Sequence, residues 1–419
     1  MQKQNSKGAA QSYAWVVLAV LFVGHIISFG MRSSFQAYIS PWELEFSISR
    51  TVVTSISMLG FVVFALSQPF AGKLNDIFGK GVIPTIGVIL VGVSLFLTSR
   101  TTQIWQVFAL YGVMFSLGVA CCTNSIVAAI VTNWFDKKRG LALGLSMSGL
   151  AVGQLILVPA NMFIIERLGW RTAMGALGIF VAVVIGPLFI FLLRSSPEEK
   201  GLKPYGHENA GDDAPINESK APERSKSLPV FNLFRKKAFW LLVIPYFLCG
   251  FTDVGIVGTH LYPMSQEKGF STAGVALAIS FVAVANITGT IVTGHLSDLF
   301  NRKRQLAVLY TLRAATFVLL IFLQQQWLLL VFAIAFGATE MASIAPTNSL
   351  AVQLFEGYSV GVVLGIVALS HQLGGAVGSW VPGLLYDLTG SYSTILFTAV
   401  FVLLCGAWMS LRLHVPGKQ

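Results

Sequence analysis

Long apolar runs alternate with short polar breaks along the whole chain. A helix that crosses the hydrocarbon core of a bilayer needs about 20 mostly apolar residues, and twelve runs reach roughly this length. They form two sets of six, separated by the one long polar stretch of the sequence. The expected helices are 14–38, 51–71, 82–99, 104–132, 142–165, 172–193, 238–262, 272–296, 306–323, 327–352, 360–386 and 393–412.

This pattern predicts an all-α polytopic membrane protein with twelve transmembrane helices in two pseudo-symmetric six-helix bundles. The bundles are expected at 14–193 and 238–412. Between them, 194–237 holds five prolines among charged and small polar residues, so it predicts a mobile cytoplasmic linker without a core of its own. Residues 1–13 and 413–419 are the expected cytoplasmic N-terminus and tail.

Composition and charge placement support the membrane assignment. The 419 residues are 55% hydrophobic and 11% charged, against about a quarter charged in soluble domains. Three-quarters of the 28 Lys and Arg residues lie in the N-terminus, the linker, the tail and alternate loops. Cytoplasmic loops of membrane proteins are rich in Lys and Arg, so both termini are expected in the cytoplasm, with the chain in the cell membrane. The opposite side carries Arg50, Arg100, Arg167, Arg171 and Lys268.

The remaining composition excludes several classes of function. The net charge of +10 needs no nucleic-acid partner, because the basic residues would face anionic lipid headgroups. No phosphate-cradling glycine loop occurs, and no catalytic constellation is recognisable, so an ATP-driven pump or an enzyme is not expected. The chain is expected to be a monomer and to bind no cofactor. No metal is expected either, since the cysteines lack metal-ligand spacing. They are Cys121, Cys122, Cys249 and Cys405.

The two halves repeat at a nearly constant offset. The segment 72–80 (GKLNDIFGK) follows the second helix, and 294–302 (GHLSDLFNR) follows the eighth, 222 residues later. Four further glycines of the first half recur at an offset of 221, and a Thr-Asn-Ser triplet recurs after a small local gap. Duplication of a six-helix unit in parallel orientation explains this spacing. The glycine pairs include Gly140/Gly361, Gly144/Gly365, Gly153/Gly374 and Gly169/Gly390, and the triplets begin at Thr123 and Thr347.

The two matching loop segments form a candidate conformational gate. Glycine lets two helix ends approach, and an aspartate can cap a helix or pair with neighbouring cations. Contacts that form in one conformation and break in another would make a latch, and a static turn with solvated charges is the alternative. The glycine rows of helices 5 and 11 predict either close packing or sliding surfaces. The candidate gate residues are Gly72, Asp76, Gly79, Lys80, Gly294, Asp298 and Arg302.

The segment Gly72-x3-Asp76-x2-Gly79-Lys80 resembles the loop signature between helices 2 and 3 of the major facilitator superfamily. The copy in the second half is similar to the degenerate form usual in that family. The resemblance covers residues 14–412, and it implies a secondary transporter that works by alternating access.

Within that superfamily the chain looks most like the monocarboxylate-transporter type. Arg32 falls within one residue of the cation that this type has in its first helix. The carboxylate-binding arginine of its eighth helix has no counterpart, because it would align near Thr290 and no Arg occurs in 277–301. The matching residues are Trp15, Arg32, Ser33, Phe35, 133–144 (NWF-x3-RG-x-A-x-G), 371–375 (HQLGG) and 383–392 (G-x3-D-x2-GSY).

Ionisable residues at membrane depth are costly, so each is a functional candidate. Arg32 in the first helix could bind an anionic substrate or snorkel to the headgroups. Asp253 lies 221 residues later in the seventh helix, and it could carry a proton, pair with Arg32 or line a pore. Glu340 in the tenth helix is a rival proton carrier. His260 could be a proton-sensitive gate or an interfacial hydrogen-bonding residue.

The other polar residues of the helices allow blander interpretations. Arg313 is expected to snorkel or to have a structural role, and His25 and His371 are expected to be core residues. Four uncharged residues could line the substrate path or form interhelical hydrogen bonds. They are Gln36, Tyr38, Asn124 and Asn348.

Three functions follow from these observations. The first is a proton-coupled carrier (a symporter) of a small organic anion. The second is an exporter of amphipathic, drug-like compounds, suggested by the missing arginine of helix 8 and by the 31 phenylalanines. The third is a membrane sensor, for which the linker is short.

Overall fold

The computed structural model describes residues 2–79, 81–206 and 228–414, and these residues form an all-helical molecule. Within them, eleven helical spans are long and apolar enough to cross a bilayer, and the shorter helix α4 (Val82–Thr98) completes the twelve. The prediction of twelve transmembrane helices is therefore confirmed. The central part of the expected mobile linker, the initiator Met1, Lys80 and the end of the tail lie outside the described residues.

Six spans besides α4 are single uninterrupted helices, and α14 and α18 are the shortest of these. They are α3 (Arg50–Phe78), α8 (Arg139–Leu168), α13 (Thr272–Leu299), α14 (Arg302–Ile321), α17 (Val360–Thr389) and α18 (Ser393–Leu411).

Five spans are built from consecutive pieces with a 3₁₀ or π turn inside. A π turn accommodates one extra residue and is frequent at functional sites. The N-terminal pieces are α1 (Gln2–Ser33), η1 (Ser34–Tyr38), α2 (Ile39–Phe46), α5 (Ile104–Val107), η2 (Phe108–Phe115), α6 (Ser116–Ala120), α7 (Asn124–Trp134), α9 (Trp170–Phe180), η3 (Val181–Ile185) and α10 (Gly186–Leu192). The C-terminal pieces are α11 (Lys237–Gly250), η6 (Phe251–Val257), α12 (Gly258–Glu267), α15 (Gln326–Glu340), η7 (Met341–Ser343) and α16 (Ile344–Leu354).

The helix ends show the local signals that stop a helix. Ser271 and Asn301 accept backbone N–H bonds at the starts of α13 and α14, which satisfies donors that have no partner inside a helix. Gly169 and Gly390 follow α8 and α17 with φ of 81° and 67°. This left-handed region favours glycine, so the repeated turn glycines have the same role in both halves.

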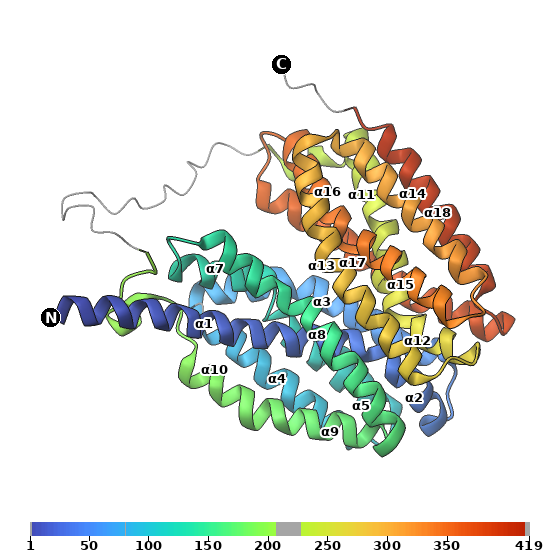
Figure 1. Ribbon diagram of the computed structural model, residues 1–419, viewed down its shortest axis with the longest axis horizontal. Coiled ribbons are helices and arrows are strands. Elements are labelled where there is room, and N and C mark those ends of the chain that lie inside the picture. Colours follow the sequence, from blue (N-terminus) through green and yellow to red (C-terminus); the bar gives the residue numbers. More distant parts are fainter. Residues whose placement is uncertain (1, 80, 207–227, 415–419) are drawn as a thin grey trace.

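Each half has its own hydrophobic core. One buried apolar cluster contains residues from 14 to 193, and the other contains residues from 233 to 413 together with three from the first half. In Figure 1 the blue-to-green half and the yellow-to-red half lie side by side, with α3 against α17 and α8 against α13 along the seam. α1 begins and α18 ends on the side of the molecule away from α2 and α12.

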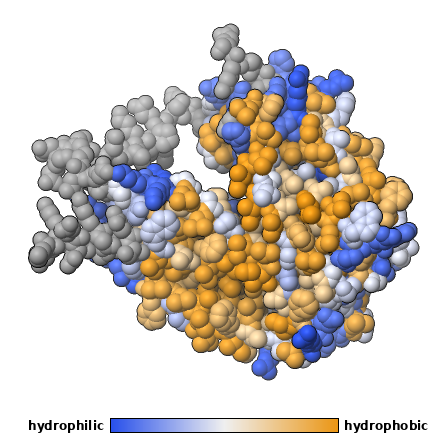
Figure 2. Space-filling model, in the orientation of Figure 1, coloured by the Kyte–Doolittle hydropathy of each residue, from blue (hydrophilic) through white to orange (hydrophobic). Residues whose placement is uncertain are grey.

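The outer surface of the helices is apolar. Phe191, Phe397, Phe401 and Trp408 are each more than half exposed, which is unusual for several large apolar side chains of a water-facing surface. Figure 2 shows the hydrophobic residues as a broad belt, with hydrophilic residues gathered toward the two ends. This belt is the surface that faces lipid.

The structure corrects several predicted helix ends. The first helix runs through η1 and α2 to Phe46 rather than ending at 38, and α3 continues to Phe78 rather than ending at 71. The polar residues near these ends were interpreted as loops. A helix satisfies its backbone hydrogen bonds internally, so it can continue into polar sequence where it leaves the membrane.

Candidate functional site

A cavity of about 540 Å³ lies at the seam between the two bundles. Helices α1, α3, α7 and α8 supply its wall on one side, and η6, α15, α16 and α17 supply it on the other. Several aromatic rings lie among a small number of polar side chains in this lining. The cavity-lining residues that were predicted from the sequence are Arg32, Gln36, Asn124, Asp253, Glu340 and Asn348.

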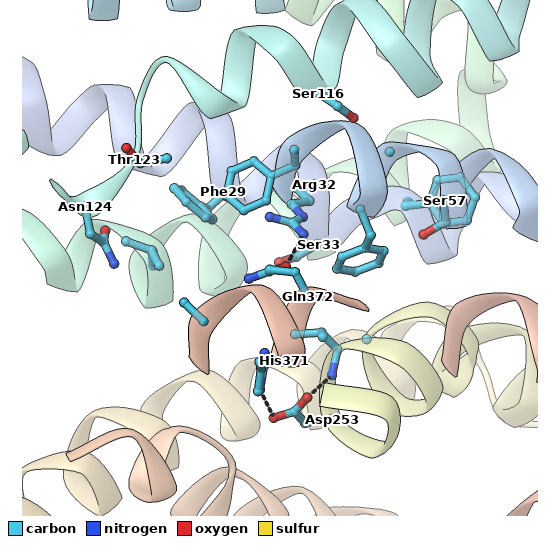
Figure 3. Close-up of a pocket in the computed structure, with 18 of the residues that line it drawn as sticks. Phe29, Arg32, Ser33, Ser57, Ser116, Thr123, Asn124, Asp253, His371 and Gln372 are labelled. Atoms are coloured by element: carbon cyan, nitrogen blue, oxygen red, sulfur yellow. Dashed lines mark hydrogen bonds and ion pairs between the residues drawn. The ribbon is translucent and has the colours of Figure 1, made fainter. Parts of the chain in front are cut away.

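Arg32 is the cation of the N-terminal wall. Its guanidinium carbon lies 4.1 Å from the ring centroid of Phe64 and 4.4 Å from that of Phe61, both on α3. Its Nη2 donates a 2.9 Å hydrogen bond to Oε1 of Gln372 on α17 (Figure 3). Among the described residues, no carboxylate lies within ion-pair distance of Arg32. The alternative that Arg32 snorkels to the headgroups does not fit the structure, because the side chain lines the central cavity.

Asp253 forms the centre of an ionic cluster on the opposite wall. Its Oδ2 lies 3.2 Å from Nε2 of His371 and 3.5 Å from Nη1 of Arg313, and its Oδ1 accepts a 2.5 Å bond from the N–H of Val254. The π turn η6 carries this aspartate. Its partners therefore come from its own bundle, and the alternative of an ion pair with Arg32 is wrong.

Arg313 is completely buried beneath the cavity. It donates to Sγ of Cys249 at 2.8 Å, to the carbonyl of Glu340 at 2.6 Å and to the carbonyl of Thr339. A side chain at this depth does not snorkel, so the structural alternative holds. The sequence could not decide between the two alternatives, because residue count gives depth along a helix, while the helix rotation decides which way the side chain points.

His371 is the residue that the sequence analysis misjudged most. It was expected to be a core histidine, as His25 is, which is fully buried and bonded to the carbonyl of Ser146. Instead His371 lines the cavity and binds Asp253 (Figure 3). A signal was present, because Ser370, His371 and Gln372 form a run of three polar residues in the middle of a glycine-rich apolar helix.

Glu340 is held at the end of α15. Its Oε2 accepts a 2.6 Å bond from the amide of Asn286, whose Oδ1 accepts from the backbone N–H of Met341 at 3.1 Å. Among the described residues, no cation lies within ion-pair distance of its carboxylate. Glu340 is thus a cavity carboxyl with a neutral partner, in contrast to Asp253.

The Cys249, Asp253 and His371 ligand atoms lie within 4.8 Å of one another, so they could be considered for a metal ion. The guanidinium of Arg313 already contacts the sulfur and the carboxylate of this group. A cation placed there would be repelled by this permanent charge. The donor set therefore fits an arginine better than a metal.

Some of the uncharged candidates line the cavity, and others form hydrogen bonds between helices. Asn124 and Asn348 line the cavity. Gln36 lines it as well, and it also joins the bundles, because its Oε1 accepts from the N–H of Tyr262 at 3.1 Å. Tyr38 is buried, and its hydroxyl donates a 2.5 Å bond to Asn161 of α8, so it is an interhelical contact.

One end of the cavity is closed by charged side chains from both bundles. Arg50 pairs with Glu43 at 2.7 Å and with Glu267 of α12, and its guanidinium lies 3.9 Å above the ring of Tyr386. Asp387 accepts from the N–H groups of Arg50 and Thr51, at 3.2 and 2.8 Å, and from the Thr51 hydroxyl. We call these residues the Arg50 cluster.

His260 belongs to the support of this cluster rather than to the cavity. Its Nε2 donates to the carbonyl of Ser379 at 2.7 Å, so Nδ1 is free to accept from the Tyr392 hydroxyl at 3.0 Å. Tyr392 in turn accepts from Arg50 at 3.0 Å. The hydrogen-bonding alternative for His260 is the one that the structure contains.

The candidate gate lies at the other end, and its glycines Gly72 and Gly294 have open space around them. A Cβ added at Gly72 or Gly294 would meet no heavy atom within 4 Å outside its own helix, so the expected close approach of helix ends at these glycines is absent in this conformation. Gly79 has φ of 94°, Asp76 is exposed, and Arg302 donates to the Ser297 carbonyl and to Gln353. Lys80 and the side chain of Asp298 lie outside what the structure describes.

Comparisons with known proteins agree with this architecture. The chain is 26% identical over 403 residues to the uncharacterized MFS-type transporter YcxA of Bacillus subtilis, covering 94% of this chain and 92% of the relative. It is 25% identical to monocarboxylate transporter 12 of Homo sapiens, with 94% and 78% covered, and 23% identical to monocarboxylate transporter 13 of Rattus norvegicus, with 96% and 89% covered.

Solved transporters share the fold. A D-xylose–proton symporter superimposes with a TM-score of 0.73 at 16% identity, covering 96% of this chain and 98% of that one. A bacterial homologue of the human lysosomal transporter Spinster, inward-facing and occupied, gives the same TM-score and identity, with 96% and 97% covered.

The family profile described as the Major Facilitator Superfamily matches residues 21–324 and 247–419. These matches span both bundles and the seam that holds the cavity. The chain belongs to the Major Facilitator Superfamily, and it is a multi-pass membrane protein and a secondary transporter of a small molecule, not an enzyme.

Proposed function

We propose that this transporter carries a small organic anion together with protons, by alternating access of its two bundles. The observation that supports this most is the different pairing of the two charged walls. Asp253 has Arg313 and His371 as partners, whereas the one polar partner of Arg32 within the part of the chain that the structure describes is a neutral amide. A cation at membrane depth gains most from an anionic partner, and a carboxylate fits the donor geometry of a guanidinium. The substrate's carboxylate is the partner that Arg32 lacks.

The proton is assigned to the carboxyl groups of the C-terminal wall. Glu340 has an amide partner, so it can take up or release a proton without breaking an ion pair. Asp253 can do so only when its contacts with His371 and Arg313 change. His260 is less suited, because both of its ring nitrogens are bonded away from the cavity.

The gate and the orientation complete the proposal. The Arg50 cluster closes one end of the cavity. In the opposite conformation, the helix faces around Gly72 and Gly294, which have open space in this structure, would meet and close the other end. The positive-inside distribution assigns the glycine end, with both termini, to the cytoplasm of a cell membrane. The relatives named monocarboxylate transporters support the substrate class, although the missing arginine of helix 8 indicates a different placement of the carboxylate.

The test is uptake into proteoliposomes of a panel of radiolabelled monocarboxylates, driven by an imposed inward proton gradient. Wild-type uptake should stop when a protonophore collapses the gradient. Arg32→Gln should reduce uptake at least roughly tenfold, because a hydrogen bond to a charged group is worth about 1.5–3 kcal/mol. Arg100→Gln is the matched control, since Arg100 stacks on Phe96 outside the cavity. Wild-type uptake in Arg32→Gln would remove the anion site from this proposal.

A second candidate is an exporter of amphipathic compounds. It is favoured by the aromatic lining, which includes Phe29, Phe35, Phe61, Phe64 and Phe115. Growth of cells with toxic amphipathic compounds, with and without the gene, separates the two. Resistance that persists in Arg32→Gln would favour the exporter.

A further inference from the structure

The contact between Arg32 and Gln372 crosses the seam between the bundles. Arg32 belongs to α1 and Gln372 to α17, 340 residues apart, and the N–O distance is 2.9 Å. In Figure 3 the two side chains meet between the helices that carry them, with His371 and Asp253 on the other side of α17. Of the five N–H donors of a guanidinium, this is the one that has a hydrogen-bond partner among the described residues.

The amide oxygen of Gln372 lies where an anionic oxygen would be expected. Guanidinium groups bind carboxylates through two parallel hydrogen bonds, and such charge-assisted bonds are about twice as strong as neutral ones. An amide offers a single neutral oxygen. We propose that Gln372 occupies the carboxylate position of the anion site and that the transported anion binds by displacing it. This proposal rests on the anion-carrier function proposed above.

The exchange can take place by movement of a side chain, without a shift of α17 toward α11. A Cβ added at Gly250 would lie 2.0 Å from the carbonyl oxygen of His371, and one added at Gly374 would lie 2.0 Å from that of Phe247. The backbones of α11 and α17 are therefore in direct contact on both sides of position 372, and neither can shift toward the other. Rotation of the long, flexible Gln372 side chain is a movement that this packing leaves open.

Arg32 is equally fixed on its side. The rings of Phe61 and Phe64 flank the guanidinium, and aromatic faces attract a cation. The arginine therefore stays in place while its partner changes. Arg32 therefore alternates between two partners, the neutral amide of Gln372 and the charged carboxylate of the transported anion.

This arrangement determines which solutes bind. When a carboxylate displaces Gln372, Arg32 exchanges a neutral acceptor for a charged one, and binding gains free energy. When a neutral solute of the same shape displaces Gln372, Arg32 exchanges one neutral acceptor for another, and binding gains nothing from the exchange. Gln372 is thus a specificity-determining residue. It also gives the buried cation a partner while the carrier is empty, which lowers the cost of returning without substrate.

The experiment measures binding to the full-length protein in nanodiscs by calorimetric titration. The probe is 3-phenylpropanoate, a carboxylate on an aromatic body that suits the ring-lined cavity, and 3-phenylpropanamide is its neutral control. The variants are Gln372→Leu, Gln372→Glu and Arg32→Gln. Gln324→Leu is the matched control, because Gln324 is an exposed glutamine outside the cavity.

Gln372→Leu should bind the carboxylate roughly three- to tenfold more tightly, because the internal competitor is gone. Gln372→Glu should bind it at least about tenfold more weakly, because the introduced carboxylate competes on equal terms. Gln324→Leu should match the wild type. If Arg32→Gln abolishes binding while both Gln372 variants bind like the wild type, the anion site stands and the role of Gln372 is wrong. If Arg32→Gln binds the carboxylate like the wild type, the proposed function fails, and the role of Gln372 fails with it.

A ligand-free measurement decides the case in which the probe does not bind. Gln372→Glu should raise the thermal unfolding midpoint when Arg32 is present and lower it in the double variant with Arg32→Gln, where the introduced carboxylate has no cation. Equal changes in the two backgrounds would show that position 372 does not present an anion to Arg32, and would overturn the proposal.

Discussion

At the end of the cavity formed by α2, α12 and the start of α3, charged side chains from both bundles interlock in the Arg50 cluster. At the opposite end, six repeated glycines of α3, α8, α13 and α17 face no neighbour within 4 Å outside their own helices. Figure 2 shows a notch between the two halves on this side. The glycines are Gly72, Gly140, Gly144, Gly294, Gly361 and Gly365.

The glycines nearer the middle of the same helices behave differently. A Cβ at Gly153 would lie 2.5 Å from the carbonyl of Ile26, and one at Gly378 would lie 2.1 Å from that of Phe251. One helix therefore carries two kinds of small residue. The packed ones are close helix contacts within a bundle, and the open ones have space around them. The contrast teaches that one glycine row can contain both kinds of position, at different depths, and that the sliding role remains a prediction for the open ones alone.

The largest effect is expected from enlarging a packed glycine. Gly378→Val would place a branched side chain against the backbone of η6, which cannot yield, and overpacking of this kind costs about 1–3 kcal/mol or more. The thermal unfolding midpoint in detergent should fall, with loss of folded protein. Gly365→Val on the same helix has open space around it and should keep the wild-type midpoint. Equal losses in both variants would contradict the distinction between packed and open glycines.

An intermediate effect is expected from filling an open glycine. Gly365→Phe should fold normally but obstruct closure of the glycine end, so proteoliposome uptake should fall about tenfold or more, equivalent to about 1.4 kcal/mol on the rate-limiting barrier. Leu404→Phe, on the exposed face of α18, is the control and should transport normally. Full activity of Gly365→Phe would mean that this face never closes.

The smallest effect is expected from removing one ion pair of the closed end. Glu267→Gln breaks a contact between the bundles but leaves the pair of Arg50 with Glu43. The carboxylate of Glu267 is about one-third exposed, so solvent screens the pair and its loss should shift the equilibrium only a few-fold toward opening. The measurement is the labelling rate of a cysteine placed in the cavity, with a reagent that is added on the side of the Arg50 cluster. A faster rate would report the shift toward opening.

Glu45→Gln is the matched control for this substitution. Glu45 pairs with Arg171 at 2.9 Å within one bundle, so breaking that pair should leave the accessibility of the cavity unchanged. A larger change from Glu45→Gln than from Glu267→Gln would show that the Arg50 cluster does not hold the end closed.

The fold was predictable because it follows from run lengths and repetition. Apolar runs of membrane-spanning length have few alternative structures in lipid, and the offsets of the glycines revealed the two halves. Arg32, Asp253 and Glu340 were identified as cavity candidates for the same reason, since charge at membrane depth is rare.

The pairing of these charges was not predictable. Whether Asp253 meets Arg32 or Arg313 depends on the rotation of each helix about its axis, and near-symmetric positions in the sequence do not fix that rotation. His371 was missed because a single histidine on an apolar helix has the same local sequence whether it faces a core or a cavity. Glycine spacing likewise does not say which members of a row are in contact.

The π turn η6 has a consequence for the spacing of polar groups in the seventh span. Beyond this turn, α12 carries Tyr262, whose N–H binds Gln36 across the seam, and Glu267 of the Arg50 cluster. Closing Phe251–Val257 into a regular α-helix with the same number of residues would rotate everything after it by about 100°. Both seam contacts would then turn away from their partners while the span stayed apolar and long enough to cross the bilayer. The π turn therefore sets the rotation of α12 relative to Asp253, so that Asp253 and both seam contacts face their own partners from one span.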